Sequence, residues 1–231
     1  MSTDPLYHAW NCVGYEHVKT EVVDGALRVV VAKARGEPEC AGCGSTQVTL
    51  EGTREVSLRA VPIGQTRVYL VLRLLMLRCR QCHVVRQEKF DLAAPRKSYT
   101  RQFAEYVLVL TRYMTLQDVA ELLKVGWDLV KEILKQDLER RAALRSWKGV
   151  RRIAIDEIAV KKGHKYLTVV VDLDSGEALY TAEGHDHTSL EPFFKRLEAE
   201  GAKLEAIAVD MGTGYRKGIE LYAPKDVAVI Y

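Results

Sequence analysis

The sequence predicts an α+β protein of several domains, because three stretches of its 231 residues carry different patterns. Two Cys-x-x-Cys pairs flank strand-like segments within residues 1–97, and residues 98–147 show the apolar spacing of helices. Residues 148–231 then alternate strand-like and helix-like segments in the order βββαβαβ. We therefore expect three domains with these boundaries.

The composition excludes several classes of protein. Hydrophobic residues make up 48% and charged residues 28%, which is typical of a globular chain and not of a disordered or fibrous one. The N-terminus has no basic segment followed by an apolar one, so we expect no secretory signal. The most apolar stretch, residues 68–77, is shorter than the about 20 apolar residues of a membrane span. A cytoplasmic protein without a membrane partner is expected.

Charge is distributed unevenly along the chain. Residues 1–152 contain 25 Lys and Arg against 17 Asp and Glu, a net charge of +8, whereas the remainder contains 9 against 14, a net charge of −5. The basic residues cluster within 67–101 and 131–152. Such clusters favour a nucleic-acid partner, because Lys and Arg displace the counterions of its phosphates. Solvated surface faces would produce the same pattern.

The cysteines form two pairs, Cys40 with Cys43 and Cys79 with Cys82, and leave Cys12 single. Two such pairs supply the four thiolates of a structural zinc ion. Residues 48–62 and 66–77 have strand patterns around the turn Ile63-Gly64-Gln65, and a hairpin there would join the pairs into a zinc ribbon over residues 40–82. Disulfides do not suit a reducing compartment, and a redox Cys-x-x-Cys centre would need a βαβ context that is absent here.

The middle of the chain predicts a helix-turn-helix. Helical spacing covers residues 98–113 and 115–123, and a further helix starts at about Trp127 after the turn Lys124-Val125-Gly126. In that motif the second helix enters the major groove of DNA. The expected DNA-binding residues on this helix are Trp127, Asp128, Lys131 and Lys135. A plain helical hairpin with Trp127 in its core is the alternative.

The C-terminal part has the element order of a ribonuclease-H-like fold up to its fifth strand. Strands are expected over 151–160, 166–173, 177–182, 204–209 and 226–231, with helices from a capping box at Thr188–Glu191 and around 215–221. Two carboxylates that follow apolar runs in these strands matter most here. Asp156 follows the apolar run Ile153-Ala154-Ile155, and Asp210 follows Ala206-Ile207-Ala208-Val209.

Asp156 and Asp210 would meet at one end of the sheet if their strands are neighbours. Paired carboxylates can share divalent cations, and two such ions stabilise the attacking and leaving oxygens of a phosphoryl transfer. Each Asp alone could simply end a strand. We assign Asp172 and Asp174 to a turn, and His185 and His187 to a polar loop. Glu157 is a secondary candidate, because it points to the opposite face of its strand from Asp156.

These residues together resemble the bacterial insertion-sequence transposases of the ISL3 family. The matching elements are the cysteine pairs, KVGWDLVK in the helix-turn-helix, IAIDEIAVKKGHKYLTVVVDLDSGEALY and IAVDMGTGYRKGIELYAP. The resemblance implies a DDE-type enzyme that cuts and joins DNA with Mg²⁺ or Mn²⁺, and Asp156 and Asp210 match its first two catalytic acids. It also implies a bacterial, nucleoid-associated protein that binds the double-stranded terminal repeats of its element and self-associates on them.

The resemblance further implies a third acid, a Glu on a helix beyond the fifth strand, to which no residue of this sequence corresponds. The expectation is a C-terminally truncated transposase that binds DNA but is inactive, with a sheet destabilised by its uncovered face. The alternatives are a non-catalytic DNA-binding fragment that competes with an intact transposase, and a zinc-ribbon regulator whose C-terminal part only mediates interactions.

Overall fold

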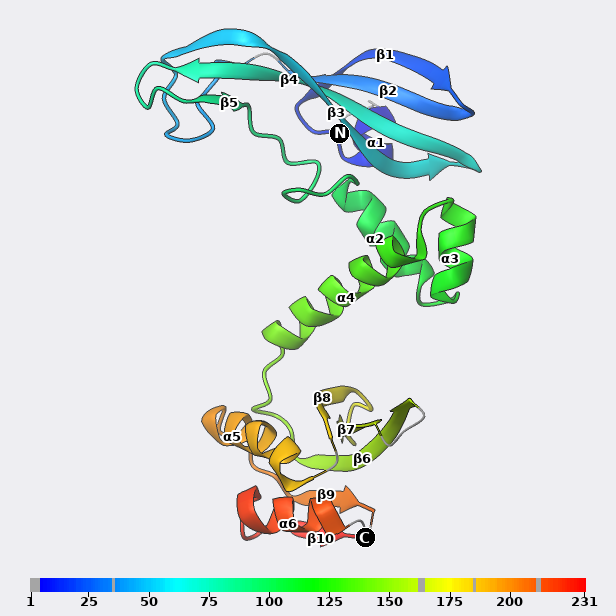
Figure 1. Cartoon of the computed structure of the whole chain (residues 1–231), viewed down its shortest axis with the longest axis vertical. Helices are drawn as coiled ribbons and strands as arrows, with labels where there is room; N and C mark the ends of the chain where they lie inside the picture. The colour runs from blue at the N-terminus through cyan, green and yellow to red at the C-terminus, as the bar shows by residue number, and fades with distance from the viewer. Residues whose placement is uncertain (1–4, 35, 162–164, 185, 211–212) are drawn as a thin grey trace. The chain divides into compact units, whose positions relative to one another are not determined.

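The computed structural model describes residues 5–34, 36–161, 165–184, 186–210 and 213–231 (Figure 1). The chain forms two compact units, residues 1–137 and residues 138–231. Helix α4 (Trp127–Leu144) contributes residues to both units. The three-domain boundaries after residues 97 and 147 stay a prediction.

A twisted sheet with helix α1 (Pro5–Trp10) packed against it makes up much of the first unit. Its strands are β1 (Tyr15–Val23), β2 (Ala26–Lys33), β3 (Val48–Ile63), β4 (Thr66–Cys79) and β5 (Val85–Gln87). They lie in the order β1-β2-β4-β3, with β5 paired to β4. The predicted hairpin is confirmed as β3 and β4, whose pairing runs from Ile63 opposite Thr66 to Val48 opposite Cys79. No element is predicted for residues 15–33, where the structure adds β1 and β2.

The helices of the first unit are α2 (Arg101–Leu110), α3 (Leu116–Leu123) and the first part of α4. Phe103, Val119, Val130 and other apolar side chains on their facing sides form one core. The predicted cap of α3 is confirmed, because Thr115 and Asp118 exchange side-chain-to-backbone hydrogen bonds as a capping box. The turn to α4 places Lys124 in the left-handed region, with φ 52°, while Gly126 has no positive φ.

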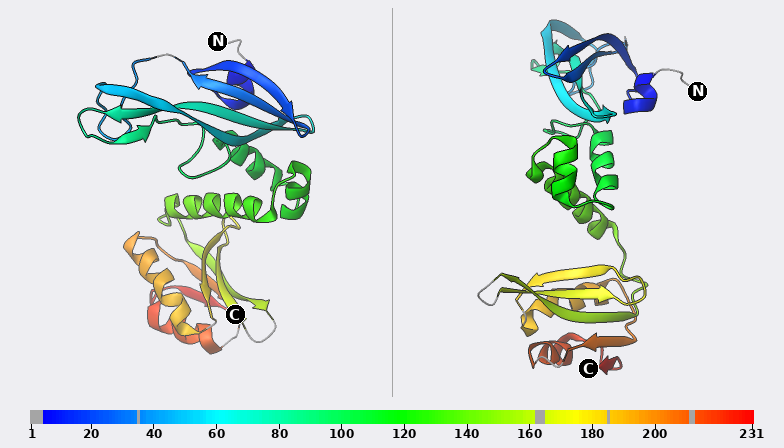
Figure 2. Two further views of the ribbon diagram at one scale, coloured as in Figure 1. Left: turned by 45° about the horizontal axis from the view of Figure 1, so that its top comes forward. Right: turned by 90° about the vertical axis from the view of Figure 1, so that its right-hand side faces the viewer.

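The second unit has the predicted βββαβαβ order. Its strands are β6 (Arg152–Lys161), β7 (Lys165–Asp172), β8 (Ala178–Glu183), β9 (Ala206–Val209) and β10 (Ala228–Ile230). They lie in the order β10-β9-β6-β7-β8, so that β6 pairs in parallel with β9 and antiparallel with β7. Helices α5 (Glu191–Ala199) and α6 (Thr213–Tyr222) cover one face (Figure 2). Their Phe193 and Ile219 pack in the same core as Ile155 of β6.

The predicted capping box at Thr188–Glu191 is wrong. A 3₁₀ turn, η1 (His187–Leu190), precedes α5, and its N-cap is Asp186. The Asp186 carboxylate accepts hydrogen bonds from the amides of Thr188 and Ser189, at 2.9 and 3.3 Å. Asp186 lies two residues before Thr188, and its charged oxygen is the stronger acceptor for exposed helix-start amides.

Among the described residues, none of the helices is both long and apolar enough to cross a membrane.

Candidate functional site

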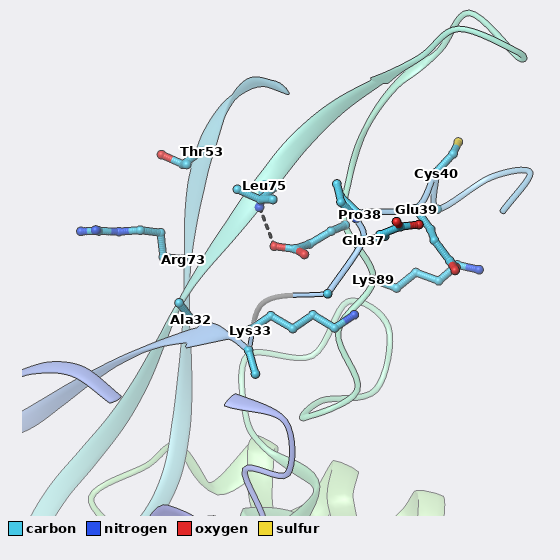
Figure 3. Close-up of a pocket in the computed structure, with 14 residues that line it drawn as sticks. Ala32, Lys33, Glu37, Pro38, Glu39, Cys40, Thr53, Arg73, Leu75 and Lys89 are labelled. Atoms are coloured by element: carbon cyan, nitrogen blue, oxygen red, sulfur yellow. Dashed lines mark hydrogen bonds between the residues drawn. The ribbon is translucent and has the colours of Figure 1, made fainter. Parts of the chain in front are cut away.

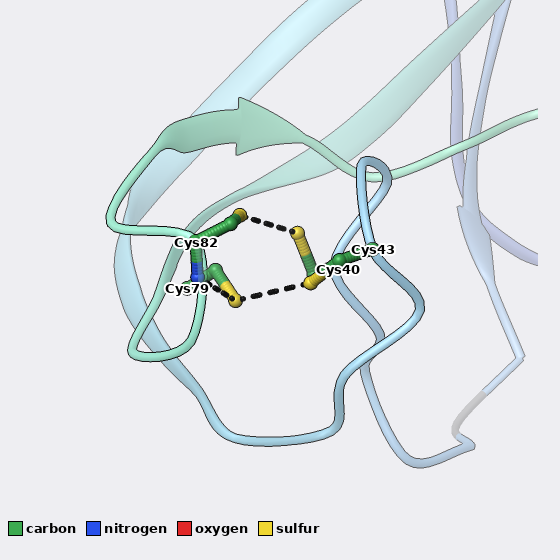
Figure 4. Close-up of side chains that lie close together, drawn as sticks. All are labelled: Cys40, Cys43, Cys79 and Cys82. Carbon is green, nitrogen blue, oxygen red and sulfur yellow. Dashed lines mark hydrogen bonds between the residues drawn. The ribbon is translucent and has the colours of Figure 1, made fainter.

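Four cysteine thiols meet at the open end of the β3–β4 hairpin (Figure 4). Their sulfur atoms all lie within 4.8 Å of one another. The Sγ atoms of Cys40 and Cys82 are 3.6 Å apart, and those of Cys43 and Cys79 are 3.5 Å apart. All are free thiols, and Cys12 is buried elsewhere, in the core of the sheet. The predicted cluster of Cys40, Cys43, Cys79 and Cys82 is therefore formed.

The cluster has the geometry and the donor chemistry of a zinc-ribbon site. Tetrahedral zinc with bonds of about 2.3 Å to sulfur sets the sulfur atoms roughly 3.8 Å apart, close to the separations found here. The first cysteine of each pair also accepts amide hydrogen bonds: Gly42 donates to Cys40 at 3.4 Å, and Gln81 to Cys79 at 3.3 Å. The amides of Cys43 and Gly42 lower the pKa of Cys40 to about 6. These bonds favour the thiolate form of Cys40 and Cys79, which is the form that binds metal. Hydrogen bonds with the Cys79 and Cys40 sulfurs instead raise the pKa of Cys43 and of Cys82.

A charged hollow of 540 Å³ lies beside the cluster, between the end of β2, residues 36–41 and strand β4 (Figure 3). Side chains of both signs line it, among them Lys33, Glu37 and Lys89. The carboxylate of Glu88, also on its wall, accepts a hydrogen bond of 2.7 Å from the amide of Leu75. That bond holds the segment after β5 against β4, so Glu88 has a structural role here.

The parallel pairing of β6 and β9 brings the two candidate carboxylates to the same level of the sheet. Ile155 is the direct partner of Val209 across these strands, and Asp156 and Asp210 are the next residue of each. Both Asp side chains are exposed. The Asp156 carboxylate accepts a hydrogen bond of 2.7 Å from the amide of Glu157. Since Ile155 points into the core under α5 and α6, Asp156 lies on the other face of β6.

Glu157 sits directly opposite Thr168 of β7, on the face that α5 and α6 cover. Thr168 is buried, and its hydroxyl lies 3.0 Å from those of both Ser189 and Tyr215. Burial raises the pKa of Tyr215, and the charges of Glu157 and Asp156 raise it further. Sequence reasoning missed this hydroxyl network; the only signal was a Tyr in the helix that follows Asp210.

The remaining polar candidates have structural partners. Asp172 is buried and accepts hydrogen bonds from Ser175 Oγ at 2.7 Å and from Arg145 at 3.2 Å. Asp174 pairs with Arg152, whose hydrogen bonds lower the pKa of that carboxyl. Both belong to the turn predicted for them. His187 lies in η1, and His185 falls outside the described residues.

The candidate DNA-binding residues occupy the exposed side of α4, opposite the buried Val130 and Ile133. Trp127 is 42% exposed and therefore not a core residue. The Lys131 ammonium lies 5.0 Å from the centre of the Trp127 ring, at the distance of a cation–π contact. Asp128, Lys131 and Lys135 border a shallow groove along the helix. The structure thus brings Trp127, Asp128, Lys131 and Lys135 to one accessible face.

Three family models match successive parts of this chain. Residues 36–82 match the zinc-finger of transposases IS204, IS1001, IS1096 and IS1165. Residues 88–137 match the helix-turn-helix domain of transposase family ISL3, and residues 153–230 match the ISL3 transposase domain. Each matched region contains one of the three sites described above.

Two curated relatives are similar in sequence. The transposase for insertion sequence element IS1001 of Bordetella parapertussis is 28% identical over 94% of this chain and 54% of its own length. The transposase for insertion sequence element IS1557 of Mycobacterium tuberculosis is 40% identical over 45% of this chain and 24% of its own. The chain thus spans about half the length of the first relative. The HTLV-2 integrase catalytic core domain aligns with 37% of this chain at a TM-score of 0.27 and 17% identity, too weakly to support an argument.

Proposed function

Because the chain belongs to the ISL3 family of transposases, we propose that it binds the double-stranded terminal repeats of an insertion sequence. We propose in addition that it supplies two carboxylates for cutting and joining that DNA. The observation that carries the catalytic part is the pairing of Ile155 with Val209, which aligns Asp156 with Asp210.

DNA binding is assigned to α4. Its exposed face carries Trp127, Lys131 and Lys135, and its buried face is fixed on α2 and α3. A recognition helix needs this division, because one side must reach base edges while the other holds the helix in place. Lys131 and Lys135 would neutralise phosphates, and Trp127 and Asp128 would contact base edges or sugars. The net charge of +8 over residues 1–152 supports a polyanionic partner.

Catalysis is assigned to Asp156 and Asp210. Both are exposed carboxylates at neighbouring strand positions, a donor set that suits Mg²⁺ or Mn²⁺. Bound there, such ions would stabilise the attacking and leaving oxygens of phosphoryl transfer. The chain's own part is to hold Asp156 within β6 and Asp210 directly after the neighbouring β9, at the same level of one sheet.

The cysteine cluster is assigned a structural role with zinc. Its ligands come from the loop before β3 and from the end of β4, so the ion would lock the open end of the hairpin. From the similarity to ISL3 transposases alone, we also propose that the chain is a bacterial protein of the cytoplasm that associates with the nucleoid and self-associates on its DNA. A non-catalytic DNA-binding protein that competes with an intact transposase is the alternative.

The deciding experiment separates binding from cleavage. Duplexes selected by the purified chain from a random-sequence pool are incubated with it and Mn²⁺, and strand cleavage is followed on gels. Cleavage that Asp156→Asn and Asp210→Asn abolish supports the enzyme, while binding without cleavage supports the competing DNA-binding protein. Asp226→Asn is the matched control, because Asp226 is an exposed Asp of the same unit. A chain that selects no duplex refutes both.

Metal binding gives a second readout that does not depend on activity. Mn²⁺ titration followed by electron paramagnetic resonance should show a site that Asp156→Asn or Asp210→Asn weakens and Asp226→Asn leaves intact. Equal Mn²⁺ binding by all four proteins would contradict the assignment of the carboxylates.

A further inference from the structure

Arg59 is a buried cation at the junction between the sheet and the helices of the first unit. It is 5% exposed, and none of the described carboxylates forms an ion pair with it. Its guanidinium lies 5.4 Å from the ring centres of both Tyr69 and Phe103. Arginine is rarely buried without an acidic partner, because loss of hydration is costly for a charged group. Burial accordingly lowers the pKa of Arg59.

The guanidinium joins a strand to the end of a helix. One terminal nitrogen donates to the carbonyl of Val68 on β4 at 3.1 Å, and the other donates to the carbonyl of Leu123 at 2.9 Å. Leu123 is the last residue of α3, where carbonyls lack partners within the helix and the helix dipole is negative. A cation is therefore favoured at this position.

The backbone of the same residue holds the start of another helix. The Arg59 amide donates to Ser98 at 2.8 Å, and the amide of Thr100 donates to the Arg59 carbonyl at 2.9 Å. Thr100 is the N-cap of α2, and its hydroxyl accepts from the amide of Phe103. One residue of β3 thus fixes where α2 begins and where α3 ends.

The end of α3 leads directly to the face that we assign to DNA. Lys124 follows Leu123 in a left-handed conformation, and α4 begins at Trp127. A shift of Leu123 would therefore tilt α4. An apolar side chain could fill the same space without losing hydration, so holding two carbonyls in place is what the guanidinium adds.

We propose that Arg59 is a positioning residue for DNA recognition: its guanidinium holds the helix-turn-helix in one orientation on the hairpin that carries the cysteine cluster. This inference rests on the proposed assignment of α4 to DNA. Arg59 is buried, so it contacts no DNA itself, and its effect is on selectivity among sequences more than on the general attraction to phosphate.

The test compares Arg59→Met with Arg54→Met in the full chain. Both variants lose one positive charge from β3, but Arg54 is exposed. Affinity is measured by fluorescence anisotropy for a duplex selected by the unsubstituted chain and for an unrelated duplex. Arg59→Met should weaken binding to the selected duplex by about tenfold or more, the loss caused by one mismatched base pair. Its binding to the unrelated duplex should change little, and Arg54→Met should weaken both duplexes alike, by less than about fivefold.

Two further measurements separate positioning from general destabilisation. Zinc content should be the same in both variants and the unsubstituted chain, while amide hydrogen exchange over residues 116–126 should rise only in Arg59→Met. Equal selectivity of the two Met variants overturns the proposal. Should Arg59→Met not fold, Arg59→Lys replaces it: a Lys keeps the charge but lacks the planar fork, so full selectivity in this variant overturns the proposal too. Failure of the unsubstituted chain to select any duplex instead removes the proposed function, and this inference with it.

Discussion

The side-chain hydroxyls of Thr168 and Tyr215 lie 3.0 Å apart in the core of the second unit. Thr168 belongs to β7 and Tyr215 to α6, so the contact links α6 to β7. Strand β7 pairs with β6, the strand that carries Asp156. Thr168 also donates to the Gly184 carbonyl at 2.9 Å and meets Ser189 Oγ at 3.0 Å. A buried polar network stabilises a fold when all its members are paired, as they are here. It anchors α6, the helix that begins just after Asp210.

Replacing Tyr215 by Phe should loosen this anchor. The substitution removes a buried hydroxyl but keeps the ring in the core, and the loss of one hydrogen bond should cost about 1 kcal/mol of unfolding free energy. Amide hydrogen exchange over β7 and α6 measures the change. Tyr231→Phe, at a residue that is 58% exposed, is the control and should show none. Equal exchange in the two variants would contradict the structural role of the network.

Gly218 should not tolerate a methyl group. A Cβ there would lie 3.2 Å from the Cα and 3.3 Å from the carbonyl oxygen of His187, which are backbone atoms of η1. Overpacking costs about 1–3 kcal/mol, which outweighs the about 1 kcal/mol that Ala gains over Gly in a helix. Thermal unfolding of Gly218→Ala should thus occur at a lower temperature than that of Gly149→Ala, where nothing lies within 4 Å. Equal thermal midpoints of the two variants would show that η1 can shift enough to make room for the added methyl group.

Patterns that are local in sequence predicted much of the fold. The hairpin follows from two β-rich runs around a Gly-containing turn, and its ends placed both cysteine pairs together, as the structure confirms. The strand order predicts that the strands of Asp156 and Asp210 are neighbours, and their parallel pairing up to Ile155 and Val209 puts the two Asp residues level, although Asp156 lies within β6 and not at its end. These features need only periodicity and connectivity.

Three other features were not predicted from the sequence. Strands β2 and β4 pair in parallel although they are far apart in the sequence, and no local sequence pattern indicates this pairing. The sequence does not predict that Arg59 is buried, because its guanidinium binds the carbonyls of Val68 and Leu123, and Leu123 is distant in sequence. The Thr-x-x-Glu pattern at Thr188–Glu191 predicts a helix that is capped by Thr188, yet Asp186 caps the turn η1 that precedes α5.

Lys131→Ala should weaken DNA binding and reduce its salt dependence. If Lys131 neutralises a phosphate, its removal lowers the slope of log affinity against log salt concentration by about 1. Affinity measured over a range of KCl concentrations gives this slope. Lys203→Ala, at an exposed residue of the other unit, should leave the slope unchanged. An unchanged slope in Lys131→Ala would remove this residue from the interface.

Zinc should be present and should stabilise the first unit. Metal analysis of the purified chain is expected to find about one zinc per chain, the content of a four-thiolate site. Cys43→Ser should lose most of this zinc and open the β3–β4 hairpin to hydrogen exchange. Cys12→Ser removes a thiol outside the cluster and should keep the metal. No zinc in the unsubstituted protein, purified without chelators, would refute the assignment.

The Asp186 cap should make the second unit sensitive to acid. Hydrogen bonding from the Thr188 hydroxyl, with that from backbone amides, lowers the pKa of Asp186 in the folded chain. A carboxyl whose pKa is lower folded than unfolded stabilises the fold above its unfolded pKa of about 3.9, and this contribution disappears as the pH falls through the folded value. Asp186→Ala should therefore cost about 1 kcal/mol at neutral pH, as removal of a helix cap does. Its thermal midpoint should approach that of the unsubstituted chain as the pH is lowered below the pKa of the folded carboxyl. A difference between the two midpoints that does not change with pH would show that the charge of Asp186 contributes nothing to the cap.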